Sequence, residues 1–220
     1  MSASRRPLLA FFPRLKKSEP FTLSRLPELA HNRPLVGLYL ATILYATGYY
    51  TGYSYIEPFL QQVAQVPDVL ITAALTIFGV AGLAGSWLFA RFFDGHRRAF
   101  LSAAMIGVSA ALFILLPLAG WLIGPLVTCV VWGISATAFN VAAQAEVIRI
   151  TSEEASAVAM SIFSGLFNVG IGTGSIVGGI VCDGPGVSLV GAVGGVIAVA
   201  GALYCVMRLG GLLERVGKAA

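Results

Sequence analysis

Charged side chains are scarce in this sequence. They make up 11% of its 220 residues, whereas soluble domains carry about 25%. Hydrophobic residues account for 57% of the chain, and the mean hydropathy is +0.86. So little polar surface could not cover a globule in water, which excludes a soluble domain and indicates a membrane protein.

Cysteine is also scarce. The chain has three cysteines, Cys129, Cys182 and Cys205, and an odd number at wide spacing excludes a secreted disulfide scaffold. No Cys/His cluster has metal-ligand spacing, so we expect neither a metal site nor a cofactor. No residue pattern indicates an ATPase, a protease or a redox enzyme, and we therefore expect that the protein is not an enzyme.

The charged residues that are present divide the chain into long uncharged runs. A helix needs about 20 residues to cross about 30 Å of hydrocarbon. The longest run, residues 99–145, is broken into two helices by a Pro- and Gly-containing segment, residues 117–125. The pattern predicts an all-α membrane protein in which residues 34–208 form a six-helix bundle, with spans of about 35–56, 69–90, 99–117, 122–145, 155–181 and 187–207.

The lysines and arginines all fall on one side of this predicted topology. The 14 basic residues lie in the N-terminal tail, in the second and fourth connections and at the C-terminal end. Because cytoplasmic connections carry the excess of Lys and Arg, we expect both termini in the cytoplasm, with tails at residues 1–33 and 209–220. No nucleic-acid recognition motif accompanies the basic charge, so we expect no nucleic-acid partner.

The sequence also contains a weak internal repeat at an offset of 89 residues. Residues 78–94 align with residues 167–183, and the identical pairs are Phe78/Phe167, Val80/Val169, Gly85/Gly174, Ser86/Ser175 and Asp94/Asp183. The same offset places the first three spans on the last three. Because three is an odd number, the two triplets would cross the membrane in opposite senses, which predicts two inverted three-helix repeats. A chance match between Gly-rich apolar helices is the alternative.

Aromatic residues and one carboxylate mark the first predicted span. Tyr50, Tyr53 and Glu57 have the spacing i, i+3, i+7, which places them on one face of a continuous helix. Tyrosine rings can stack on the apolar face of a sugar, and a carboxylate accepts hydrogen bonds from hydroxyl groups. We therefore consider Tyr50 and Tyr53 as substrate-binding residues and Glu57 as the residue that couples transport to an ion. The alternative is an aromatic belt at the membrane interface.

Amide side chains follow single stripes on the fourth and fifth spans. Asn140 and Gln144 lie on one stripe, and Asn168 lies on the other beside Phe167. Amides within a bilayer are costly unless they are paired or face water. We therefore expect Asn140, Gln144, Phe167 and Asn168 to line a polar substrate cavity; hydrogen bonds that only join helices are the alternative.

The second predicted connection is short and carries several charges. Arg91, Asp94 and Arg98 lie close together in it, and ion pairs among such residues can hold helix ends together. We consider these three residues as a cytoplasmic latch. The alternative is an ordinary solvated loop.

Several strings resemble the bacterial sugar efflux transporters of the drug:proton antiporter branch of the major facilitator superfamily. They are Tyr53–Phe59 (YSYIEPF), Phe163–Gly172 (FSGLFNVGIG), residues 158–160 and residues 78–86. The resemblance covers residues 33–208 and is to the C-terminal half of these twelve-helix proteins, with residues 1–33 similar to their central cytoplasmic loop. One departure is Ala157, where the family often has an acidic residue.

The resemblance implies proton-coupled export of sugars or related small solutes across the bacterial inner membrane. It implies as partners the lipid bilayer and either a missing N-terminal six-helix half or a second copy of the chain, because the family's transport cavity lies between two bundles. Other interpretations stay open: a truncated or homodimeric membrane protein without independent transport, or an exporter of drugs, nucleosides or amino acids.

Overall fold

The computed structural model describes residues 26–121 and 123–217. Within these ranges the chain is helical and contains no strand. The long helices are α2 (Arg33–Tyr53), α4 (Asp68–Phe92), α5 (Arg97–Ile114), α6 (Gly124–Arg149), α7 (Glu153–Asp183) and α8 (Val190–Tyr204). The short elements are α1 (Leu26–His31), α3 (Ile56–Gln62), η3 (Val187–Leu189), the π-helical turn η4 (Cys205–Leu209) and α9 (Gly210–Gly217). The prediction of an all-α protein is confirmed.

Five helical segments of the described chain are long and apolar enough to cross a membrane. They are Asp68–Phe92, Arg97–Ile114, Gly124–Arg149, Glu153–Asp183 and Val187–Leu213, and they correspond to the last five predicted spans. The helix at the first predicted span, α2, has 21 residues but is not among the five. Its sequence is rich in tyrosine and threonine, which makes it less apolar than the others.

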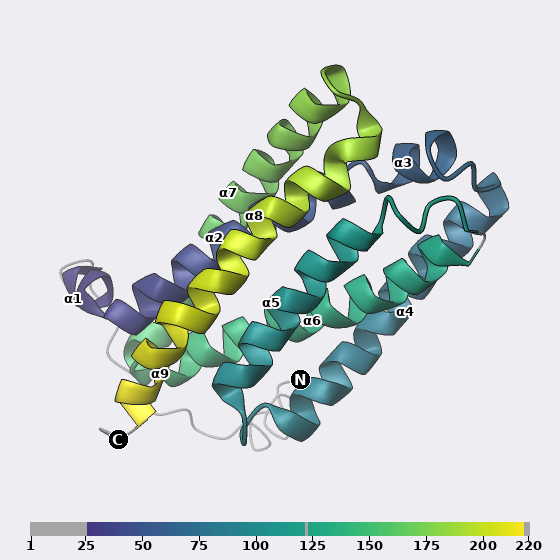
Figure 1. Ribbon diagram of the computed structural model, residues 1–220. Helices are drawn as coiled ribbons and strands as arrows, with labels where there is room; N and C mark the ends of the chain where they lie inside the picture. The colour runs from purple at the N-terminus through teal and green to yellow at the C-terminus, as the bar shows by residue number, and fades with distance from the viewer. Residues whose placement is uncertain (1–25, 122, 218–220) are drawn as a thin grey trace, which may run out of the picture.

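The long helices form two groups. In one group α2 packs between α7 and α8, and in the other α6 packs between α4 and α5 (Figure 1). Contacts between α5 and α8 join the two groups. The fully buried side chains include Leu38 of α2, Met105 of α5 and Trp132 and Phe139 of α6, so the core lies where α2 and α6 face the other helices.

Two glycines allow close helix contacts, one within each group. A Cβ atom added to Gly85 of α4 would lie 2.3 Å from the backbone oxygen of Ile134 in α6. A Cβ atom added to Gly174 of α7 would lie 2.5 Å from the backbone oxygen of Thr47 in α2. Small residues let helix backbones approach in this way. The two glycines are one of the identical pairs at the offset of 89 residues.

Local sequence explains where several helices begin and end. The Asn32 side chain accepts a hydrogen bond from the backbone N–H of Leu35 at 3.2 Å and caps α2. Ser152 caps α7 in the same way through Ala155 N–H at 3.4 Å. At the other end of α2 the helix stops at Tyr53, and a new helix, α3, begins at Ile56. Pro58 has no backbone N–H, so it cannot donate to the Ser54 carbonyl as a helix continuing from α2 would require.

Described residues of both predicted tails are helical and pack on the bundle. Residues 1–25 of the predicted N-terminal tail lie outside the described residues, and α1 packs on α2 with Leu29 buried. At the C-terminal end the helix continues from α8 through η4 into α9, and Leu209 and Leu213 are buried. The apolar side chains of these residues therefore extend the bundle beyond the predicted end at residue 208.

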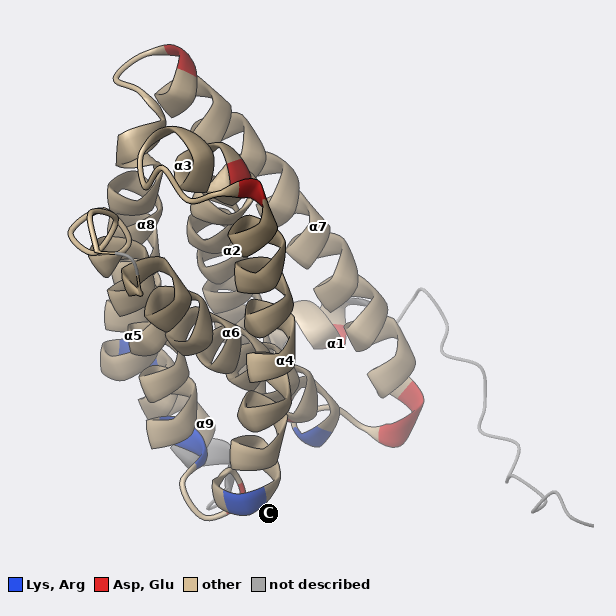
Figure 2. Ribbon diagram, turned by 90° about the vertical axis from the view of Figure 1, so that its right-hand side faces the viewer, with Lys and Arg blue, Asp and Glu red and all other residues tan. Residues whose placement is uncertain are grey.

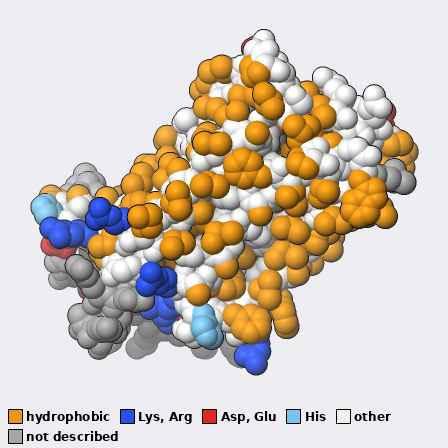
Figure 3. Space-filling model, viewed as in Figure 1, with side chains coloured by type: hydrophobic (Ala, Val, Ile, Leu, Met, Phe, Trp, Pro, Cys, Tyr) orange, Lys and Arg blue, Asp and Glu red, His pale blue; other side chains and the backbone are white. Residues whose placement is uncertain are grey.

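The outer surface separates apolar and charged side chains. Figure 3 shows hydrophobic side chains over most of one face and basic side chains at its lower end. In Figure 2 the Lys and Arg residues gather toward one end of the described bundle, which we call the basic end. It includes Arg91 at the end of α4, Arg97 and Arg98 at the start of α5, Arg149 at the end of α6 and Arg208 in η4. The opposite, acidic end includes Glu57, Asp68 and Asp183. An apolar middle between two polar ends suits a bilayer.

Candidate functional site

An aromatic cluster surrounds α2 in the interior of the bundle. The Tyr50 ring lies 5.9 Å from that of Tyr53 and 6.3 Å from that of Phe167, measured between centroids. The Tyr53 ring also lies 5.2 Å from that of Phe78. Three of the expected substrate-binding residues, Tyr50, Tyr53 and Phe167, thus belong to one network of ring contacts, and each of them is half-buried.

Phe78 and Phe167 enter this cluster from α4 and α7, the second helices of the two predicted repeats. Phe78 contacts Tyr49, Tyr53 and Trp132, whereas Phe167 contacts Tyr45, Tyr50 and Phe163. The two phenylalanines are another pair at the offset of 89 residues, so equivalent positions approach α2 from two different helices.

Two buried tyrosine hydroxyls of α2 are paired with backbone oxygens. The Tyr45 hydroxyl donates to the carbonyl of Ala136 at 3.0 Å, and the Tyr39 hydroxyl donates to that of Ala159 at 2.8 Å. Both bonds join α2 to another helix and hold its rotation about its own axis. Tyr50 and Tyr53 are more exposed than these two residues, so their rings are the ones that can meet a ligand.

The amide residues keep free hydrogen-bonding capacity. Gln144 Nε2 donates to Asn140 Oδ1 within α6, and Asn168 Nδ2 donates to the Ser164 carbonyl within α7 at 2.8 Å. An amide has two N–H donors and an oxygen that can accept two bonds. Each of these side chains can therefore bind a further polar group. Asn140 and Gln144 are half-buried, and Asn168 is exposed.

Glu57 lies apart from the aromatic cluster. Because the helix breaks after Tyr53, Glu57 belongs to α3 and does not share one helical face with Tyr50 and Tyr53, in contrast to the spacing argument. It lines an open pocket of about 570 Å³ at the acidic end, between α3 and α4. The pocket is lined by Glu57, Gln61, Asp68, Ile71, Thr72, Leu75 and Thr76.

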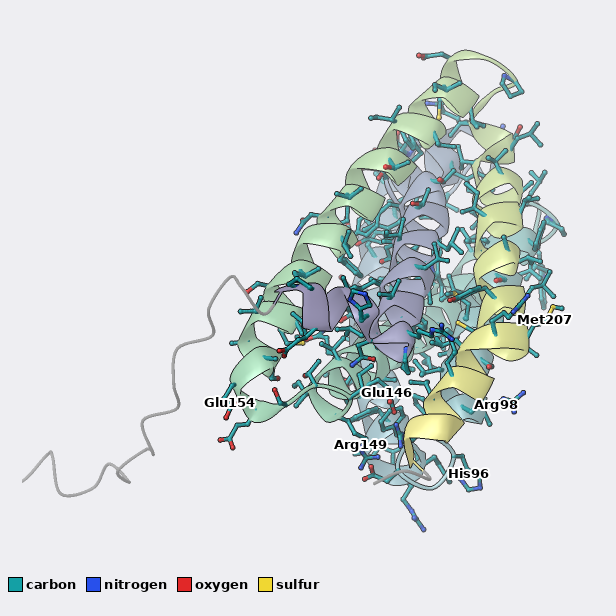
Figure 4. The ribbon with its side chains drawn as sticks, turned by 90° about the vertical axis from the view of Figure 1, so that its left-hand side faces the viewer. His96, Arg98, Glu146, Arg149, Glu154 and Met207 are labelled. Atoms are coloured by element: carbon teal, nitrogen blue, oxygen red, sulfur yellow. The ribbon has the colours of Figure 1, made fainter. Side chains whose placement is uncertain are left out.

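At the basic end, the strongest charge contact joins Arg97 to Glu146. Arg97 Nε and Nη2 donate to the two carboxylate oxygens of Glu146, which is fully buried in α6. Figure 4 shows Glu146 within the helical bundle and Arg149 near its lower end. The pair ties the start of α5 to the end of α6.

Two of the three predicted latch residues, Asp94 and Arg98, contact other parts of the molecule. Asp94 pairs with Arg149 at 3.3 Å, and Arg98 Nη2 donates to the Val206 carbonyl at 3.2 Å. The guanidinium of Arg91 lies over the ring of Phe92, 5.6 Å from its centroid. Asp94 therefore connects the α4–α5 loop to α6, and Arg98 connects the first turn of α5 to the η4 turn.

Sequence reasoning missed the Arg97–Glu146 pair because it placed Glu146 in a connection after a span ending at residue 145. The structure continues α6 to Arg149 and buries Glu146 one turn before its end. A signal was available: Glu146 directly follows the uncharged run of residues 99–145, and a carboxylate within a membrane helix usually has a partner. Among the residues that the structure describes, no group of three His, Cys, Asp or Glu side chains could hold a metal ion.

Curated bacterial proteins are similar to this chain over most of its length. The chain is 38% identical over 187 residues to a "Probable sugar efflux transporter" of Helicobacter pylori (strain P12), covering 84% of this chain and 47% of the relative. It is similar at the same identity and coverage to the protein of that name from Helicobacter acinonychis (strain Sheeba). The chain thus spans about half the length of the curated relatives it matches.

These names are those of transporters, which agrees with the expectation that the protein is not an enzyme. The several apolar helices indicate a multi-pass membrane protein. The family model of the Major Facilitator Superfamily matches residues 12–218, so nearly the whole sequence contributes to the match. The chain belongs to the Major Facilitator Superfamily.

Proposed function

We propose that this chain is the C-terminal half of an exporter that moves sugars or related small solutes out of the bacterial cytoplasm in exchange for protons. The observation that carries the proposal is the 38% identity over 84% of the chain to relatives named as probable sugar efflux transporters. The match covers 47% of those relatives, which is the length expected of one six-helix half.

The proposal includes α2 as the sixth membrane span and an inverted repeat of α2, α4 and α5 with α6, α7 and α8. The packing supports it: α2 lies between the second and third helices of the other repeat, and α6 does the same. The contacts of Gly85 with α6 and of Gly174 with α2 are equivalent under this exchange. Equivalent helix contacts favour the repeat over a chance sequence match.

We place the basic end of the bundle at the cytoplasmic surface of the inner membrane, with both termini in the cytoplasm. All 14 lysines and arginines of the sequence fall in tails and connections of one side. The ion pairs Arg97–Glu146 and Asp94–Arg149 and the Arg98–Val206 contact would then hold the cytoplasmic ends of α4, α5, α6 and α8 together. Such contacts let the half move as one rigid body.

The substrate wall consists of residues from α2, α6 and α7. Tyr50, Tyr53 and Phe167 provide aromatic faces for the C–H surface of a sugar ring, and Asn140, Gln144 and Asn168 provide donors and acceptors for its hydroxyl groups. This combination suits a small, uncharged, polar solute. Glu57 faces the pocket at the acidic end, where protonation of its carboxylate would couple transport to the proton gradient.

Alternating access requires two bundles that rock around a central site, and this chain supplies one. Its partner is an N-terminal six-helix half, or a second copy of the chain that takes the same position. Both partners would cover the exposed side of α7, where Asn168 lies.

Everted membrane vesicles test this function. In them, respiration acidifies the lumen, so an exporter that exchanges sugar for protons accumulates sugar inside. The chain would be produced alone and together with the part of the Helicobacter pylori relative that it does not match. We expect uptake of labelled L-arabinose only in the second case, and its loss on adding a protonophore. Equal uptake by the chain alone would favour the homodimer, and no protonophore-sensitive uptake of arabinose, glucose or lactose in either case would refute sugar export.

A further inference from the structure

Trp132 of α6 has a buried polar atom without a hydrogen-bond partner. Its side chain is fully buried, and its indole N–H is the one buried side-chain donor or acceptor that lacks a partner within residues 26–121 and 123–217. Buried polar groups are almost always paired, because an unpaired donor loses its bond to water and gains nothing in return. The exception therefore needs a physical reason.

The rings around Trp132 separate it from the half-buried side of the aromatic cluster. Their centroids lie 5.5 Å (Tyr49), 6.0 Å (Tyr53) and 5.9 Å (Phe78) from that of the indole, each in an edge-to-face arrangement. Tyr49 is buried, whereas Tyr53 and Phe78 are half-buried. The latter two rings are thus the layer between the indole and the side on which a ligand would arrive.

The backbone of α2 also approaches the indole closely. A Cβ atom added to Gly52 would lie 3.2 Å from Cη2 and 3.7 Å from Cζ2 of Trp132. Both carbons belong to the six-membered ring of the indole. Glycine at position 52 leaves α2 no side chain here, so the α2 backbone faces this part of the indole beside the Leu112 side chain, whose Cδ2 would lie 2.6 Å from the added Cβ.

A sugar has several hydroxyl groups, and each of them needs a donor or an acceptor on the protein. Gln144 and Asn168 each use one N–H within their own helix, so each keeps one N–H and its amide oxygen for a ligand. A sugar hydroxyl both donates and accepts, so it also needs a donor on the protein. An indole N–H is only a donor, and its ring can contact the apolar face of the same sugar.

We propose that Trp132 is a substrate-binding residue whose indole N–H donates a hydrogen bond to a sugar hydroxyl when the rings of Tyr53 and Phe78 move apart. The inference rests on the proposed function, since it names a further residue of the same site. The unpaired donor is then a group held ready for the ligand, and the aromatic layer keeps water away from it when no sugar is bound.

The test uses two replacements of Trp132 in the vesicle assay, with the chain produced beside its complementary half. Trp132→Phe removes the N–H and shortens the ring, whereas 3-benzothienylalanine keeps the shape and replaces the N–H with sulfur. We expect both to raise the KM for L-arabinose about tenfold, as for the loss of one neutral hydrogen bond, with a normal amount of protein in the membrane. Trp121→Phe, at an exposed position, is the control and keeps the wild-type KM.

Tryptophan fluorescence tests the role of Trp132 separately from the proposed export of sugar. In a Trp87→Phe/Trp121→Phe background Trp132 is the remaining tryptophan of the chain, and saturating L-arabinose should change its emission, whereas equal osmolarity of choline chloride should not. Unchanged emission and an unchanged KM in the benzothienylalanine variant, while the wild type transports arabinose, would overturn the role of Trp132 alone. No arabinose transport by the wild type would overturn the proposed function and this assignment together.

Discussion

Arg97 and Glu146 form a two-pronged ion pair although they lie 49 positions apart in the sequence. The carboxylate is fully buried, and the Arg97 side chain is 22% exposed. Guanidinium and carboxylate groups match in this geometry, so both oxygens of Glu146 are satisfied. The pair therefore fixes how the first turn of α5 meets the last turn of α6.

Removing one partner of this pair should destabilise the protein strongly. Arg97→Gln leaves a buried carboxylate without its cation, and such a change typically costs about 3–5 kcal/mol. The double variant Arg97→Gln/Glu146→Gln should recover much of that loss, because no uncompensated charge remains. Thermal unfolding of the purified protein in detergent measures both effects.

The exposed pair Asp94–Arg149 is the matched control for that experiment. Its side chains are 85% and 48% exposed, and exposed ion pairs contribute about 0–1 kcal/mol. Arg149→Gln should therefore change the melting temperature little. If it costs as much as Arg97→Gln, or if the double variant is less stable than Arg97→Gln, burial does not explain the importance of Glu146.

Alanine substitutions at two nearby glycines of α7, Gly172 and Gly174, should differ in their effect on stability. In Gly174→Ala the new Cβ would meet the backbone of α2, and we expect a loss of about 1–3 kcal/mol as the helices move apart. At Gly172 nothing lies within 4 Å of such an atom, so Gly172→Ala should be neutral or stabilising, since alanine favours the helix. Equal melting temperatures of the two variants would contradict the close α2–α7 contact.

The same comparison in α4 tests the proposed repeat. Gly85→Ala places its Cβ against the backbone of α6, whereas Gly79→Ala has open space. We expect Gly85→Ala to lower the melting temperature by an amount similar to Gly174→Ala. A large effect at only one of these two positions would show that the repeats do not share their packing.

Membrane topology can be tested with a fusion at the C-terminus. Because every lysine and arginine falls on the predicted cytoplasmic side, alkaline phosphatase joined after Ala220 should be inactive, and a fluorescent protein at the same place should be bright. An active phosphatase would refute the topology with six spans.

The amides of the substrate wall should affect transport more than stability. Gln144→Ala and Asn168→Ala should each lower kcat/KM for L-arabinose about tenfold if they bind the sugar, equivalent to about 1.4 kcal/mol. Thr128→Val is the control, because the Thr128 hydroxyl is buried and bonded to Gly124 of its own helix. Wild-type transport in both amide variants would mean that these residues serve only to join helices.

The sequence alone predicted where most of the long apolar helices lie and which connections carry the basic charge. The predicted span of residues 155–181 lies within Glu153–Asp183, and residues 69–90 lie within Asp68–Phe92. These predictions succeed because the cost of placing a charge in hydrocarbon depends mainly on that residue and its neighbours in sequence. The resemblance of two strings likewise led to the correct family.

Only the tertiary structure decided which side chains meet. It separated Glu57 from Tyr50 and Tyr53 by breaking the helix, paired Arg97 with Glu146, and enclosed Trp132 within a cluster of rings. In water, the apolar face of a helix indicates which side is buried; in a membrane, lipid and protein interior are equally apolar. The rotation and register of each helix therefore depend on close packing between distant segments, which hydropathy along the sequence does not encode.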